Sequence, residues 1–386
     1  MSKTTTEPIE LPPKVPTGSQ LEGHEGLLWL TAAAVLLFIG ILKGINLVIV
    51  LAYVLLGLWA INLMLARRAT GGLSARRQPR PPVTAGVPTE WAVTVTDAGP
   101  VGGNWILEET AGGRSSRWLA LRSGPATFTV RPRFTIPTRG KHTLAPLTAH
   151  STFPFGLWTR TVKLLPAEEF IVLPQPARVD GERLRHWLFR RRAGHDAETR
   201  TVRRVVEREA EIHGLRDYRV GDAPRRIHWK ATARRNRLMV REYEDAGPPR
   251  LLLVVEPYLP ATPTADDRVR LESTISLAAG VVREWRRDAG ARLALVIAGP
   301  TPMVLDGPPG PGPTERMLEA LAVEPGGPPG NVREVLGRLS RATLAAPTLI
   351  VSARPDSAVA AAVRERTDAF VAVSHPARNE GWFQLS

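Results

Sequence analysis

Two long apolar runs near the start of the chain constrain its fold more than any other feature. They are LLWLTAAAVLLFIGIL, residues 27–42, and INLVIVLAYVLLGLWAINLML, residues 45–65. A helix needs about 20 mostly apolar residues to cross a bilayer, so the second run is long enough and the first is near the lower limit. Because only Lys43 and Gly44 separate them, the runs predict a transmembrane helical hairpin over residues 27–65.

Two other structures could carry such runs: a signal peptide followed by one anchor, or a buried hairpin in a soluble core. Residues 1–26 hold more acidic than basic side chains, and no small-residue cleavage pattern follows the first run, which is unlike a signal peptide. Few polar residues interrupt either run, whereas helices of soluble proteins usually carry a polar face. The transmembrane hairpin is therefore the favoured interpretation.

Basic residues beside the runs predict the orientation. Five arginines follow the second run, namely Arg67, Arg68, Arg76, Arg77 and Arg80. The tip between the runs offers only Lys43. Since positive flanks stay in the cytoplasm, we expect residues 1–26 to be a cytoplasmic tail and everything after Leu65 to be cytoplasmic too. The prediction is a multi-pass protein of the plasma membrane, with Trp29 and Trp59 placed to anchor at the interfaces.

Two segments of different character follow the hairpin. Residues 66–85 are basic and contain prolines, and they read as a linker. Residues 86–176 alternate apolar and polar side chains, most clearly at 91–96, 118–122 and 126–134, with Gly- and Pro-rich turns between. This pattern predicts a small antiparallel β-sandwich-like domain.

The last part of the chain, residues 249–386, changes to strands alternating with helices. Four apolar runs read as strands buried on both faces, at 251–255, 293–297, 349–351 and 369–373. Between the first two runs, apolar residues recur at spacings of 4, 3, 4 and 3 and form one helical stripe, namely Leu271, Ile275, Ala278, Val282 and Trp285. We expect an α/β domain with a mostly parallel sheet covered by helices on both sides.

Ligands of such sheets bind at the carboxyl ends of the strands, where Glu256, Ser352, Ser374 and His375 are found here. A hydrolase-type enzyme would need these side chains to converge. Ser374 and His375 are adjacent, and adjacent side chains point apart in an extended chain. We therefore expect no catalytic residues and no enzyme, and a hydrolase-type site at these strand ends remains an alternative.

Sequence motifs for other chemistry are absent. The chain holds no P-loop, no G-x-G-x-x-G after a strand, no G-x-S-x-G elbow and no H-E-x-x-H. With no cysteine, disulfides, cysteine-based zinc sites and a cysteine nucleophile are excluded. We expect no cofactor and no metal.

The net charge of +14 invites a nucleic-acid or anionic-lipid interpretation. Only six of the 51 basic residues are Lys, a bias typical of GC-rich bacterial genomes. Residues 178–250 carry 20 basic and 12 acidic residues, which gives 20 − 12 = +8. Because carboxylates are interspersed, we favour an internal network of Arg–carboxylate pairs. An Arg-rich surface for anionic lipid is the alternative, and nucleic acid is disfavoured.

The segment 177–248 contains a dense set of glycine, arginine, aromatic and acidic residues, namely Gly214, Arg216, Tyr218, Gly221, Asp222, Arg225, Ile227, Trp229, Ala233, Arg234, Arg241 and Glu242. In these residues and their spacing the segment resembles the signature of a bacterial family, domain of unknown function 58 (DUF58). The order of two membrane helices, β domain, signature and α/β domain fits as well. We expect Arg216, Asp222, Arg225 and Arg234 to have charge partners near the start of the α/β sheet, with Tyr218 and Trp229 packing beside them.

The resemblance implies a von Willebrand factor A-like domain after the signature. It also implies an association with MoxR-type AAA+ ATPases and a role in assembling or maturing other complexes. Such domains hold a metal with D-x-S-x-S after the first strand, where this chain has Glu256, Tyr258 and Pro260. Proline offers no side-chain oxygen and tyrosine is too long, which disfavours metal-dependent ligand capture. The leading hypothesis is a membrane-anchored cytoplasmic adaptor or scaffold that binds protein partners.

Overall fold

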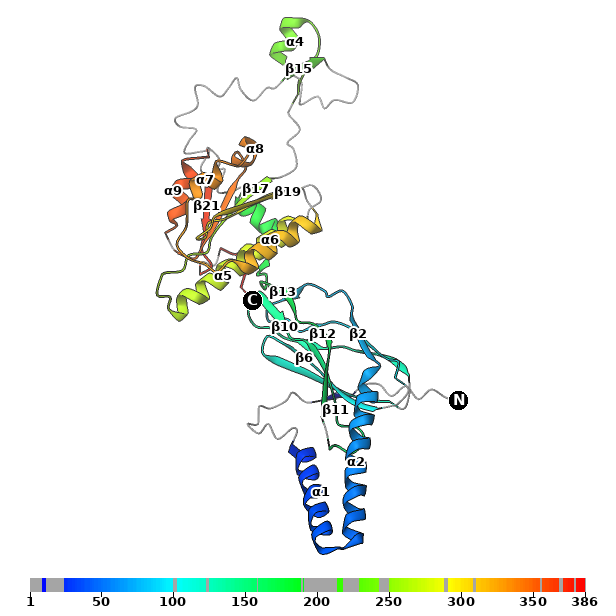
Figure 1. Ribbon diagram of the computed structural model, residues 1–386. Helices are drawn as coiled ribbons and strands as arrows, with labels where there is room; N and C mark the ends of the chain where they lie inside the picture. Colours follow the sequence, from blue (N-terminus) through cyan, green and yellow to red (C-terminus); the bar gives the residue numbers. More distant parts are fainter. Residues whose placement is uncertain are drawn as a thin grey trace. The chain divides into compact units, whose positions relative to one another are not determined.

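The computed structural model divides the chain into two compact units, residues 1–173 and residues 174–386 (Figure 1). The residues that the structure describes are 9–11, 24–99, 103–122, 125–157, 159–188, 190, 214–217, 229–242, 250–287, 291–307, 310–354, 356–367, 371–377 and 380–385.

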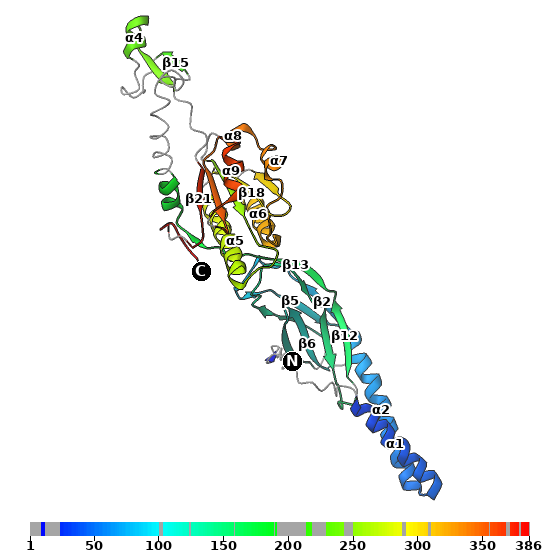
Figure 2. The same cartoon turned by 90° about the vertical axis from the view of Figure 1, so that its left-hand side faces the viewer.

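A helical hairpin opens the first unit. Helices α1 (His24–Lys43) and α2 (Asn46–Gly71) lie side by side in both views (Figures 1 and 2). Close packing is possible because small residues face the partner helix: a Cβ on Gly40 would lie 2.8 Å from Ile49 Cγ1. The indole Nε1 of Trp29 also donates a hydrogen bond to the carbonyl oxygen of Leu55, at 3.2 Å.

Both helices are long and apolar enough to cross a membrane. Only 17% and 11% of the residues in their most apolar windows are buried by protein. Large apolar side chains point outward instead, for example Leu47 with 80% of its surface exposed. Burying such side chains is worth about 1.5–3 kcal/mol each, so this surface favours an apolar environment over water.

Residues 66–85 are not a linker, which corrects the sequence interpretation. Helix α2 continues to Gly71, and strand β2 (Leu73–Arg77) and strand β3 (Val83–Thr84) follow. The helix continues because Ala66, Ala69 and Thr70 are buried on one side of its last turns. Trp105, fully buried, donates from Nε1 to the Ala69 carbonyl oxygen at 3.1 Å and joins the helix end to the β domain.

The β domain holds two main sheets. The smaller has the order β2-β5-β8, and the larger follows the path β1-β7-β6-β10-β13-β3, with β11 paired to β6 and β12. Apart from the parallel pair β13 and β3, the pairings are antiparallel. The remaining bounds are β1 (Ile9–Leu11), β4 (Thr89–Glu90), β5 (Val93–Asp97), β6 (Gly103–Ala111), β7 (Arg114–Arg122), β8 (Ala126–Val130), β9 (Arg133–Phe134), β10 (Gly140–Leu144), β11 (Leu147–Ser151), β12 (Arg160–Leu165) and β13 (Glu168–Leu173).

One hydrophobic core joins the two sheets. Val93 and Val95 of β5 pack in the same buried cluster as Trp105 and Leu107 of β6. Both strands alternate buried and half-buried residues along their length, as the sequence pattern predicted for half-buried strands. The antiparallel β-rich character of this region is therefore confirmed.

The second unit contains the expected mostly parallel sheet, in the order β19-β18-β17-β20-β21, with β19 antiparallel to β18. Its elements are β17 (Arg250–Glu256), α5 (Ala265–Trp285), β18 (Arg292–Ile297), β19 (Met303–Gly307), α6 (Pro311–Val323), α7 (Val332–Leu336), α8 (Arg341–Leu344), β20 (Thr348–Ser352), α9 (Ala358–Arg364) and β21 (Val371–Ser374). A short pair, β14 (Arg178–Val179) and β22 (Phe383–Gln384), lies beside it.

Helices cover both faces of this sheet. Alternate residues of β17 enter different cores: Leu251 and Leu253 join the cluster with α5 and α6, and Leu252 and Val254 join the cluster with α7 and α9. The whole strand is buried, which explains its continuous apolar run. The predicted stripe on α5 is buried as well.

A capping box fixes the start of α5. The Thr264 hydroxyl accepts from the Asp267 N–H at 3.2 Å, and the Asp267 carboxylate accepts from the Thr264 N–H at 2.9 Å. The hydrogen bonds from Thr264, chiefly from its hydroxyl, lower the pKa of Asp267. The pattern T-x-x-D at the start of a helix is the sequence signal for this cap.

Gly280 of α5 lies close to the backbone of the segment before β14. A Cβ there would lie 2.5 Å from the Ala177 carbonyl oxygen, which cannot move freely because it belongs to the backbone. We expect Gly280→Ala to lower the free energy of unfolding by about 1–3 kcal/mol through overpacking. Val269→Ala, on the same helix with Val269 64% exposed, should change it by less than about 0.5 kcal/mol. Urea titration of the full chain in detergent micelles measures both, and equal midpoints would contradict the close approach.

Candidate functional site

The described residues of the family-signature segment form a two-stranded sheet and a short helix. Strand β15 (Gly214–Asp217) pairs antiparallel with β16 (Met239–Glu242), so that Arg216 lies opposite Val240. Helix α4 (Trp229–Arg235) precedes β16. The two ends of the signature are thus brought together by backbone pairing, a contact that sequence alone did not predict.

The expected network of Arg–carboxylate pairs in the signature segment lies partly outside the described residues. Tyr218, Gly221, Asp222, Arg225 and Ile227 lie outside the described residues. The backbones of Gly214, Arg216, Arg241 and Glu242 lie in the paired strands. Ala233 and Arg234 lie in α4, where both are exposed.

Trp229 differs from its predicted role. It was expected to pack beside the charge pairs, but it begins helix α4 and is 66% exposed. A single aromatic residue among charged neighbours gives no period from which its burial can be predicted.

The carboxyl ends of β17 and β20 form the place in the second unit where a ligand site is expected. The chain passes from β17 to β18 on one side and later returns to β20 on the other, so the strand order reverses between β17 and β20. Open α/β sheets bind ligands at such switch points. Glu256 and Ser352 are the opposing residues of the two strands there.

These two side chains converge, together with an arginine that the sequence reading did not single out. The Glu256 carboxylate, fully buried, accepts from Ser352 Oγ at 2.8 Å and from Arg354 Nη2 at 2.9 Å. The Ser352 hydroxyl in turn accepts from the Arg354 N–H at 3.1 Å. The Arg354 guanidinium lies 4.3 Å from the centroid of the Tyr258 ring, within cation–π range.

The neighbouring strand end adds Ser374 and His375. Both are buried, and the register places Ser374 opposite Val351. His375 Nδ1 accepts from the Ala377 N–H at 3.1 Å, so this nitrogen is engaged within its own turn. The Ser374 hydroxyl finds no hydrogen-bond partner within the described ranges.

This arrangement is filled rather than open. Glu256 and Ser352 have no exposed surface, so a substrate could not reach the carboxylate or the hydroxyl in this conformation. The Arg354 charge already neutralises Glu256, and Tyr258 packs against Arg354. Across the part of the chain that is described, no group of three or more His, Cys, Asp or Glu could hold a metal ion. A metal site of the adhesion type does not fit these residues.

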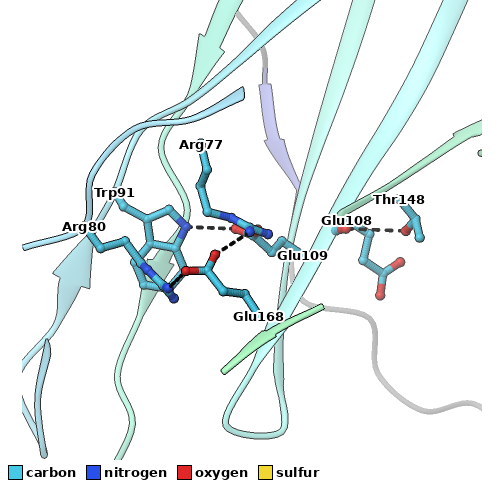
Figure 3. A network of polar contacts seen from close by, with 7 residues as sticks. All are labelled: Arg77, Arg80, Trp91, Glu108, Glu109, Thr148 and Glu168. Carbon is cyan, nitrogen blue, oxygen red and sulfur yellow. Dashed lines mark hydrogen bonds and ion pairs between the residues drawn. The ribbon is translucent and has the colours of Figure 1, made fainter. Parts of the chain in front are cut away.

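In the first unit, the buried carboxylate of Glu109 joins Arg77 and Trp91 in a hydrogen-bonded network (Figure 3). Glu109 has no exposed surface, and it accepts from Arg77 Nε at 3.1 Å, from Arg77 Nη2 at 2.7 Å and from Trp91 Nε1 at 3.0 Å. Arg77 Nη1 continues to Glu168 at 2.9 Å, and Arg80 pairs with the other oxygen of Glu168. The sequence held a signal for this network: Glu109 occupies a core-facing position of β6, where Trp105 and Leu107 precede it.

Features of both units define an α/β protein that also carries a β-rich domain and two helices apolar enough to cross a membrane. Residues 214–372 match the family model described as "Protein of unknown function DUF58". This match supports the resemblance carried by the signature segment and extends it through the parallel sheet. A search of curated proteins finds no match.

Solved structures give only weak likenesses. A CARDB domain from Pyrococcus furiosus in complex with di-metal ions is 15% identical and covers 26% of this chain and 84% of that chain, with a TM-score of 0.20. The alkylpurine DNA glycosylase AlkC from Pseudomonas fluorescens, bound to DNA, is 10% identical and covers 31% and 38%, with a TM-score of 0.18. At these TM-scores the likenesses carry no conclusion about fold or function.

We call the cluster of Glu256, Ser352, Arg354 and Tyr258 at the carboxyl ends of β17 and β20 the filled edge. Substitution of Arg354 tests it. We expect Arg354→Gln to lower the free energy of unfolding by about 3 kcal/mol, because it leaves the buried Glu256 carboxylate without its counter-ion. The double variant Glu256→Gln with Arg354→Gln should lose less, since no buried charge remains. Urea midpoints of the full chain decide this. A double variant less stable than R354Q would contradict the pairing.

Proposed function

We propose that this chain is a membrane-anchored adaptor or scaffold, with its α/β domain binding protein partners in the bacterial cytoplasm. The observation that carries the proposal is the filled edge of the parallel sheet. The place where an α/β enzyme would bind its substrate holds a carboxylate neutralised by Arg354 and a serine without exposed surface. Such an edge favours recognition of a protein surface over turnover of a small molecule.

The anchor is supported by the hairpin. Its outward apolar side chains would be stable in lipid, and exposed Arg67 and Arg68 stand near the end of α2, where phosphate headgroups would attract them. The hydrogen bond between Trp105 and the Ala69 carbonyl joins α2 to β6, so the β domain begins without a spacer. Such a connection suits a scaffold, because it holds the first domain close to the membrane.

The partner class comes from the family resemblance. DUF58 proteins are associated with MoxR-type AAA+ ATPases, and we propose such an ATPase, acting in complex assembly or cell-envelope maturation, as the partner here. The match over residues 214–372 supports the family resemblance from which this proposal is drawn. The β-sandwich-like nature of the first domain and the von Willebrand factor A-like nature of the second belong to the same proposal.

Cysteine labelling tests the anchor cleanly because the chain contains no cysteine. Lys43→Cys places a thiol at the hairpin tip, and Arg114→Cys places one in the β domain, at an exposed position. In spheroplasts, a membrane-impermeant maleimide should label K43C, and it should label R114C only after lysis. Labelling of R114C in intact spheroplasts would contradict the cytoplasmic orientation.

Site-specific photo-crosslinking in native membranes tests the adaptor role. A photoreactive residue in place of Leu259, half-buried beside the filled edge, should capture a protein partner. The same residue in place of exposed Arg316 on α6 is the matched control and should capture less. Mass spectrometry should identify an AAA+ ATPase or a cell-envelope protein. Absence of any captured protein at position 259 would count against the proposal.

A further inference from the structure

The first unit contains a cavity of about 720 Å³, which plays no part in the proposed adaptor role. Seven consecutive residues of the chain line it, from Ser74 in β2 to Arg80, and β5 and β13 supply the remainder. Its lining residues are Ser74, Ala75, Arg76, Arg77, Gln78, Pro79, Arg80, Thr94, Thr96 and Glu168. The volume lies within the range of about 300–1,000 Å³ that is usual for small-molecule sites.

Two of the arginines in this cavity are fixed by contacts with other side chains of the β domain. Arg77 is fixed by two hydrogen bonds to the fully buried Glu109, at 3.1 and 2.7 Å. Arg80 is held between rings, with its guanidinium carbon 4.8 Å from the Phe170 centroid and 5.8 Å from the Trp91 centroid. The Nη1 of Arg80 has no hydrogen-bond partner in the described part of the chain. Both guanidinium groups are therefore oriented before any ligand arrives.

One exposed carboxylate now satisfies both arginines. Glu168 accepts from Arg77 and from Arg80 with its two oxygens, while its side chain is 46% exposed, against 10% for Arg77 and 13% for Arg80 (Figure 3). Because nearly half of the Glu168 side chain is exposed, this carboxylate can rotate into water more easily than the buried Glu109 can, so Glu168 is the replaceable member of the network. Glu109, in contrast, is buried and cannot be exchanged.

We propose that Glu168 occupies the position of a ligand anion, and that the cavity binds a small molecule that carries a phosphate group. Arg77 and Arg80 contact Glu168 directly, and Arg76, which lines the cavity from the opposite, exposed face of β2, adds a third positive charge. The buried Glu109 neutralises one of these three charges. If Glu168 swings out, the remaining charge of two matches a phosphate monoester, which carries about −1.5 to −2 near pH 7. A single carboxylate would leave part of this charge unmatched.

The geometry of the donors also favours a phosphate. Guanidinium groups bind phosphate oxygens through two parallel N–H donors. The Nη1 of Arg80 is buried and has no hydrogen-bond partner among the described residues, so it becomes available to a ligand once the side chains around it move. Hydroxyl groups of Ser74, Thr94 and Thr96 line the same cavity from the exposed face of β2 and β5, which is opposite to the face that carries Arg77. They can donate to a ligand that extends around β2 at the edge of its sheet. Cross-strand pairing places Ser74 opposite Thr96 and Arg76 opposite Thr94, so these groups are carried on two adjacent strands.

Glycerol 3-phosphate is the probe, with glycerol as the ligand control, titrated calorimetrically into the full chain in phosphatidylcholine nanodiscs at low ionic strength. The wild type should bind glycerol 3-phosphate and not glycerol. Arg80→Gln should weaken binding by about tenfold or more, as expected for a lost charged hydrogen bond. Binding should also strengthen from pH 5 to pH 7, because the second phosphate pKa is about 6.

The decisive variant is Glu168→Gln. We expect it to strengthen binding by about threefold or more, because it removes the carboxylate that competes with the ligand. Glu169→Gln makes the same charge change one residue further along β13, where the side chain faces the other way, and should leave the affinity unchanged. Thermal unfolding without ligand identifies any variant that has lost its fold, and Arg80→Lys provides a charge-retaining substitute for R80Q.

A merely structural ion pair would behave differently. The proposal is overturned if the wild type binds no more glycerol 3-phosphate than glycerol at millimolar concentrations, or if E168Q weakens binding. Equal effects of E168Q and E169Q would also overturn it, since they would indicate attraction by net charge alone.

Discussion

The neutralisation of a fully buried carboxylate by arginine is the constraint on which both units depend. Glu109 in the β domain and Glu256 in the α/β domain have no exposed surface, and each would be strongly destabilising without a counter-ion. Arg77 and Arg354 supply it. Each arginine reaches its carboxylate from a segment distant in sequence, so the pairs also hold separate strands together.

The two pairs differ in the other contacts that each arginine makes. Arg354 is held by Glu256 and stacks on Tyr258, and this edge of the sheet is filled. Arg77 has one nitrogen left over for Glu168, whose exposed carboxylate also serves Arg80. The first arrangement favours a role in stability and in presenting a surface to proteins. The second has the properties of a site for an exchangeable anion, because its cations are fixed and its anion is not.

Prediction from sequence succeeded where a long periodic pattern reports burial directly. The apolar runs gave two helices, the buried strand runs gave the parallel sheet, and the stripe from Leu271 to Trp285 gave the buried face of α5. It failed at residues 66–85, where arginines and prolines resemble a linker. The secondary structure of this segment depends on the burial of Ala66 and Ala69 and on the pairing of β2 with β5. Neither is a property of the local sequence.

By itself the sequence determined the apolar hairpin, the change from antiparallel to parallel strands and the family resemblance, because each is written in neighbouring residues. Only the tertiary structure decided which arginine meets which carboxylate. Glu256 and Arg354 are 98 residues apart, and Arg77 and Glu109 are 32 apart. Pairing across such distances depends on strand order and register, which set the direction of every side chain, and a single residue's shift would turn Glu109 away from the core.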